Sequence, residues 1–248
     1  MADLDRRTLL LSAAGGALTL LNVASSQVTP MDTDNDLPIV RAALGDSLLD
    51  VQRASRYRFQ FDRIDDYDLV GRDELVQFVF AGPRPFDLPP TRFFALECTA
   101  ALVVAIDTSP HREFLSQQQA LTLADGLLER IMQAGWTNVP NDHRVTGREE
   151  LLLRLRDPAT SEDMRWYISS HTSDTATLML RLRRAHRAGR MADHDLFLLN
   201  LQFRDEALMK RADKAGDALR LADGFPADGA RRITLESYVP RVRQLIPR

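Results

Sequence analysis

The chain has 248 residues, of which 44% are hydrophobic and 27% charged, and its formal net charge is −3. At about 150 residues per domain, this length predicts one large or two small domains with enough apolar material for a folded core. The composition argues against a disordered chain, a disulfide-rich mini-protein and a membrane protein with several spans. Because acidic and basic residues nearly balance, no overall field would attract nucleic acid, and we expect no nucleic-acid partner.

The basic residues and the cysteine content indicate the kind of genome that encodes the protein and exclude some chemistry. Among the 32 basic residues only Lys210 and Lys214 are not arginine, a bias that is typical of GC-rich bacterial genomes. Cys98 is the single cysteine, so an intramolecular disulfide and a cysteine-based metal site are excluded. The apolar residues around Cys98 predict a buried, unreactive thiol.

The N-terminal segment has the pattern of an export signal. Arg6 and Arg7 precede an apolar stretch that two adjacent glycines interrupt, and small residues at positions 23–25 offer a cleavage site. The arginine pair resembles the twin-arginine translocation signal. We therefore predict a signal peptide over residues 1–25, a polar linker over residues 26–36 and a periplasmic protein, with Arg6 and Arg7 as the export-signal residues.

Three alternatives are open for this segment. Residues 8–31 carry no charge, so the segment also fits an uncleaved anchor in the inner membrane, the one membrane contact that we expect. It could form a buried core helix, although Gly15 and Gly16 disfavour a helix by about 1 kcal/mol each. Translation could instead start at Met31, which would give a cytoplasmic protein.

Hydrophobic spacing predicts the elements of the N-terminal half in order. We expect a helix over residues 36–51, capped by Asp36, and strands over residues 57–61 and 75–80. Four prolines between positions 81 and 91 predict an irregular segment. The apolar residues 93–106 predict a long central strand with a bend. A second helix begins at Ser116, whose capping box includes Gln119, and ends at Gly135.

The C-terminal half repeats this order. A short helix over residues 149–156 precedes strands over residues 164–169, 175–183 and 196–203 and a helix over residues 205–222. The predicted order of elements in each half is therefore one helix, three strands and a second helix. We predict an α+β fold of two similar units with antiparallel sheets, one over residues 37–140 and one, with a tail, over residues 146–248. A single irregular α+β domain is the alternative.

The sequence contains no motif of the common enzyme classes. It lacks a strand-linked glycine-rich fingerprint, a phosphate loop, a His-Glu-x-x-His pair and a nucleophile elbow. We therefore expect no cofactor, no bound metal and no catalytic residue. An unfamiliar hydrolase or metal-dependent enzyme is the alternative, and its candidates are His171 and Asp174 in a predicted hairpin turn, His194, and the aspartates near position 65.

Two charged loops are the candidate contact sites for a partner. An acidic turn carries Asp62, Asp65, Asp66 and Asp68, and a basic hairpin carries Arg181, Arg183, Arg184, Arg187 and Arg190. Such loops bind proteins through charge complementarity, although these two could instead pair with each other. We predict an exported, non-catalytic protein that binds another macromolecule, most simply a protein, as periplasmic inhibitors and immunity proteins do. A cytoplasmic or membrane-anchored accessory protein is a further alternative.

Overall fold

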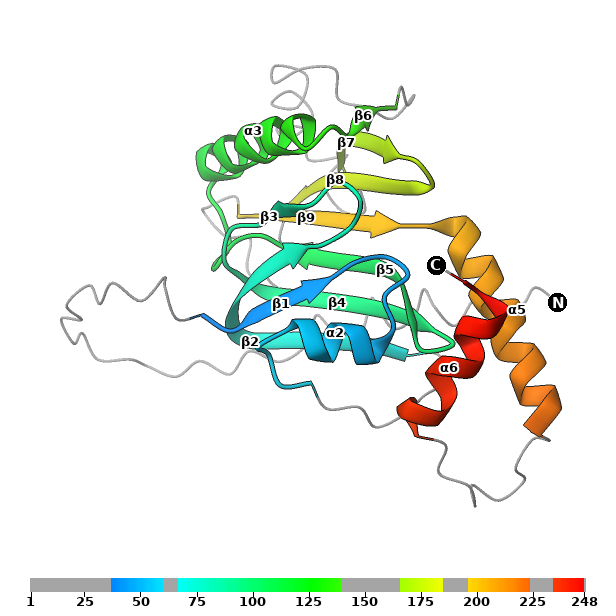
Figure 1. Cartoon of the computed structure of the whole chain (residues 1–248). Helices are drawn as coiled ribbons and strands as arrows, with labels where there is room; N and C mark the ends of the chain where they lie inside the picture. The colour runs from blue at the N-terminus through cyan, green and yellow to red at the C-terminus, as the bar shows by residue number, and fades with distance from the viewer. Residues whose placement is uncertain (1–36, 60–66, 140–165, 185–195, 224–233, 248) are drawn as a thin grey trace, which may run out of the picture.

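The computed structural model describes residues 37–59, 67–139, 166–184, 196–223 and 234–247 (Figure 1). The predicted signal peptide, the linker and the helix over residues 149–156 lie outside these ranges. The strands are β1 (Ile39–Ala42), β2 (Tyr67–Phe80), β3 (Phe86–Asp87), β4 (Thr91–Thr99), β5 (Leu102–Ser109), β6 (Thr137–Asn138), β7 (Trp166–Ser173), β8 (Ala176–Arg184) and β9 (Phe197–Arg204). The helices are α2 (Leu48–Ala54), α3 (Gln117–Gln133), α5 (Glu206–Asp223) and α6 (Leu235–Leu245).

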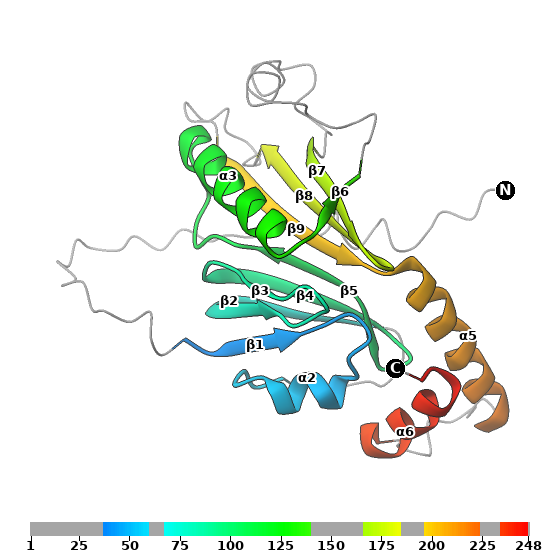
Figure 2. The same ribbon diagram turned by 45° about the horizontal axis from the view of Figure 1, so that its top comes forward.

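The predicted α+β class is confirmed, because helices accompany a mixed sheet. The described strands form one sheet in the order β1-β2-β4-β5-β9-β8-β7-β6, and β3 pairs with β2 as a branch. The pair β1–β2 is parallel, and the other described pairs are antiparallel. β5 lies beside β9, so the sheet continues from the N-terminal half of the chain into the C-terminal half. α3 contacts β9 and α5 contacts β5, so each helix packs on a strand of the other half (Figure 2).

Strand β2 belongs to two ladders. Residues up to Arg72 pair with β4, the register shifts before Val76, and the last four residues pair with β1. The shift is an irregularity of the ladder, and irregularities such as β-bulges bend a strand and increase its twist. The end of β2 can therefore lie over the sheet face that the beginning of β2 helps to form.

Four aromatic rings meet in the core at the end of β2. The rings of Phe80 and Phe203 are stacked, with centroids 4.2 Å apart and planes 8° from parallel. Trp136, just after α3, lies 5.8 Å from Phe80 and 6.0 Å from Phe203, and Phe86 of β3 completes the cluster. The indole nitrogen of Trp136 donates a hydrogen bond to the carbonyl of Arg84 at 3.2 Å, so the one polar atom of this ring is satisfied.

The second predicted helix is confirmed as α3. The Ser116 side chain accepts a hydrogen bond from the Gln119 amide, and the Gln119 side chain accepts one from the Ser116 amide. Gly135 follows the helix with φ of +84°, the left-handed conformation that glycine adopts at little cost. The predicted strands over residues 175–183 and 196–203 and the predicted helix over residues 205–222 are confirmed as β8, β9 and α5. Both ends of each element lie within one residue of the prediction.

Three predictions for the N-terminal half are wrong. Residues 39–42 form β1 instead of a helix, because they find a parallel partner in β2, and the helix begins only after Ser47, which caps it. Residues 93–106 form a hairpin instead of one bent strand. Its turn is Ala100–Ala101, whose φ values are +50° and +59°, and two alanines give no sequence signal for a turn. Tyr57 and Phe59 lie outside any strand.

The aromatic cluster predicts a large effect of one substitution. Phe203→Ala should lower the free energy of unfolding by about 3–5 kcal/mol, because it removes a fully buried ring and leaves a cavity. Phe114→Ala is the matched control, since that ring is 41% exposed, and its effect should stay below about 1 kcal/mol. Urea unfolding measures both, and equal losses would contradict the assignment of the core.

Candidate functional site: a groove beside α3

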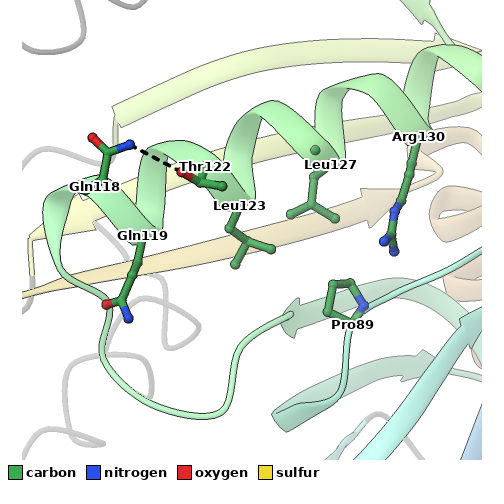
Figure 3. A pocket seen from close by; sticks show the side chains of 8 residues that line it. Pro89, Gln118, Gln119, Thr122, Leu123, Leu127 and Arg130 are labelled. Carbon is green, nitrogen blue, oxygen red and sulfur yellow. Dashed lines mark hydrogen bonds between the residues drawn. The ribbon is translucent and has the colours of Figure 1, made fainter.

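The described surface has a groove between α3 and the loop that joins β3 to β4 (Figure 3). Its volume is about 430 Å³. We call it the α3 groove. It is lined by Pro89, Gln118, Gln119, Thr122, Leu123, Gly126, Leu127 and Arg130.

One wall of the groove is an edge of α3. The helix buries a stripe that includes Ala120, Ala124 and Ile131 against the core. The groove residues follow one another at helical spacing along the side of that stripe, as residues three and four apart do on a helix. In Figure 3, Leu123, Leu127 and Arg130 extend from α3 toward Pro89. The capping box at Ser116 and the stop at Gly135 therefore fix the length of this wall.

The opposite wall is held by hydrogen bonds to β2. The Gln77 side-chain amide donates to the Leu88 carbonyl at 2.6 Å, and the Leu88 amide donates to the Phe78 carbonyl at 3.0 Å. Pro89 and Pro90 come next, and the proline ring restricts φ to about −65°. The backbone of both walls is therefore held by hydrogen bonds within the chain.

The groove has an apolar middle and polar ends. Leu123 and Pro89 flank the middle, and Leu127, which is 1% exposed and belongs to the core, forms its floor. A Cβ built on Gly126 would meet nothing within 4 Å. Arg130 is exposed and is the one charged residue among the lining residues. One of its terminal nitrogens donates to the Asp87 carbonyl at 3.4 Å, and no carboxylate among the described residues forms an ion pair with it. This mixture suits recognition of an apolar group that carries a polar or charged neighbour.

The sequence did not single out this groove, and the residues that it did single out lie elsewhere. Asp68 is in β2, opposite Glu97, and Arg181 is in β8, opposite Asn200. β4, β5 and β9 lie between these two strands, so Asp68 and Arg181 are not neighbours. Arg183 and Arg184 also belong to β8. The remaining predicted site residues lie outside the described ranges: Arg6, Arg7, Asp62, Asp65, Asp66, Arg187, Arg190 and His194.

The residues of the alternative enzyme hypothesis are only partly described. His171 lies within β7 instead of in a hairpin turn, and it is 2% exposed. The polar run before Asp174 imitates a turn in the sequence, but in the strand His171 faces the core. The turn itself contains Asp174, which is exposed and has φ of +51°. A buried imidazole needs a structural opening before it can reach a substrate.

His111 is a residue that the sequence did not reveal as important. Its Nδ1 atom lies 2.7 Å from the Glu113 carbonyl, and its Nε2 atom accepts a hydrogen bond from the Leu199 amide at 3.3 Å. These contacts require the neutral tautomer with a proton on Nδ1. Leu115 and Phe197 exchange two backbone hydrogen bonds beside it. Together these bonds fasten the connection before α3 to the start of β9.

Burial lowers the pKa of His111 below its ordinary value of 6.5, and the Glu113 carbonyl acts in the opposite direction. The folded protein therefore binds fewer protons than the unfolded chain once the pH falls below about 6.5. The free energy of unfolding should decrease as the pH is lowered through this value and level off below the folded-state pKa. In His111→Gln this decrease should be smaller. Urea unfolding at a series of pH values tests it, and identical pH profiles would contradict the role of His111.

No helix in the described ranges is both long and apolar enough to span a membrane. Among the same residues, no three His, Cys, Asp or Glu side chains gather as metal ligands would. Comparison of the chain with family models, with curated proteins and with solved structures finds no match.

Proposed function

We propose that this protein is a non-catalytic binding protein and that it holds a segment of a partner protein in the α3 groove. The observation that carries the proposal is the groove itself: a concave surface of about 430 Å³ with an apolar middle, polar ends and two fixed walls. Sites of this shape and lining bind ligands because they desolvate an apolar group while a few polar groups set its orientation.

The α3 groove is an anchor point within a larger contact. Stable protein interfaces bury about 1,600 Å² in total, yet a few residues in well-packed pockets supply most of the binding energy. The charged residues at positions 62–68 and 181–190 are proposed as further contacts, because complementary charges speed association and select the partner.

The proposed compartment is the periplasm, and the proposed class is that of inhibitors or immunity proteins that neutralise another protein. Support comes from the export-signal pattern around Arg6 and Arg7. Inhibitors of this kind act through shape and charge complementarity, so they need none of the catalytic motifs that the sequence lacks.

We also propose that the two halves of the chain are structurally similar units. β2, β4 and β5 form one antiparallel series and β7, β8 and β9 another, and their last strands meet at β5–β9. Each series is followed by a helix that contacts the last strand of the other series. An approximate two-fold axis between β5 and β9 would produce this reciprocal arrangement.

Filling the groove should abolish partner binding. Gly126→Trp places an indole in the open space beside Gly126, whereas Gln133→Trp adds the same ring to an exposed position of α3 outside the groove. A partner captured by the unaltered protein should bind Gly126→Trp at least about 10-fold more weakly, because loss of a central anchor costs 1.4 kcal/mol or more. It should bind Gln133→Trp normally. Equal affinities for the two variants, with both shown to be folded by thermal unfolding, would contradict the proposal.

The export signal can be tested without knowing the partner. In the cell, the unaltered protein should be found in the periplasm with a new N-terminus near position 25, and a variant with Arg6→Lys and Arg7→Lys should stay in the cytoplasm. Cell fractionation and N-terminal sequencing measure both. An intact cytoplasmic chain, or one that begins at Met31, would refute export.

A further inference from the structure

The charge at one end of the α3 groove points to the chemistry of the segment that binds there. Some described arginines have carboxylate partners: Arg204 pairs with Glu97 at 3.6 Å, and Arg243 pairs with Asp50 at 3.2 Å. Among the described residues, Arg130 makes only the long hydrogen bond to the Asp87 carbonyl, although a guanidinium carries five N–H donors. The planar fork of arginine matches a carboxylate, which it can bind through two parallel hydrogen bonds.

The opposite end of the groove offers neutral hydrogen-bonding groups. The Gln119 side-chain oxygen accepts a bond from the Ser116 amide, which leaves its NH₂ group to donate elsewhere. Gln118 and Thr122 are joined by a bond of 3.4 Å, near the limit for a hydrogen bond, so both can exchange it for a better partner. Amides and hydroxyls of this kind can bond to the backbone of a peptide whatever its side chains are.

Helix geometry gives the length of the segment. From Gln119 to Arg130 the helix rises about 16 Å at 1.5 Å per residue. An extended chain covers about 3.3 Å per residue, so about five residues would span the groove. Along the helix axis, the midpoint of Leu123 and Leu127 lies about 7.5 Å from Arg130. In an extended chain, residues two positions apart are about 6.6 Å apart and their side chains point to the same side. Two such side chains of a bound segment can therefore reach Arg130 and the two leucines.

We infer that the α3 groove binds an extended segment of about five residues in which an Asp or Glu side chain lies two positions from a large apolar side chain. The carboxylate binds Arg130, the apolar side chain packs on Leu123 and Leu127, and the backbone bonds to the amides of Gln118 and Gln119. This inference rests on the proposed function of the groove and adds the chemistry of the ligand.

Random heptapeptides displayed on phage test the inference with the full-length protein, and a second selection on Gly126→Trp removes peptides that bind elsewhere. Peptides lost on Gly126→Trp should share an apolar residue and an acidic residue two positions apart. Peptides selected on the Arg130→Glu variant should carry Lys or Arg in place of the acidic residue. On Arg211→Glu, an equal charge change at an exposed position of α5, the acidic preference should persist.

Synthetic peptides then measure the effect. A selected peptide with an amidated C-terminus, so that no terminal carboxylate competes, should bind at least about 10-fold more tightly than its Asn or Gln counterpart. That difference should vanish on Arg130→Gln. Groove-dependent peptides without an acidic preference would overturn this inference but leave the proposed function intact. Failure to select any peptide whose binding is lost on Gly126→Trp would also overturn the inference. The proposed function is tested separately, by measuring the binding of a captured partner to Gly126→Trp.

Discussion

The stacked contact between Phe80 and Phe203 joins the end of β2 to β9, two strands that are not neighbours in the sheet. β2 and β9 are separated in the sheet by β4 and β5, so no ladder hydrogen bond joins them. The two rings nevertheless lie 4.2 Å apart, and the register shift in β2 precedes the end of the strand that carries Phe80. A buried aromatic pair contributes its hydrophobic area and about 0.5–1.5 kcal/mol more from ring geometry. Together with the β5–β9 ladder, this contact places residues of the N-terminal and C-terminal halves in one core.

The geometry of the α3 groove follows from this contact. β9 holds both ends of the connection that contains α3, since Phe197 exchanges backbone hydrogen bonds with Leu115 and Phe203 packs against Trp136. β2 holds the other wall through its bonds to Leu88. Because Phe80 and Phe203 join β2 to β9, the core helps to set the distance between the walls, and the hydrogen bond from Arg130 to the Asp87 carbonyl links the two sides at the surface.

The sequence was informative where structure is decided by neighbours along the chain. Ser116, Gln119 and Gly135 act within one or two helical turns of their own positions, and they predicted α3 correctly. The alternation of Leu178, Leu180 and Leu182 likewise predicted β8. β1 was misread because its partner is nearly forty residues away in β2, and nothing local distinguishes it from a helix. The groove was missed for the same reason, since Pro89 and Arg130 meet only after the core has formed.

Gly126 suggests that the groove is more than a gap left by packing. A glycine within a helix is less favourable than alanine by about 0.8–1.0 kcal/mol, and it sits near the middle of a helix with a complete capping box. No close contact explains it, because a Cβ at this position would meet nothing within 4 Å. The cost is therefore not imposed by the fold around α3. What the missing side chain does provide is depth beside Leu123 and Leu127, and a bound chain can use that depth to bring its own backbone close to the helix.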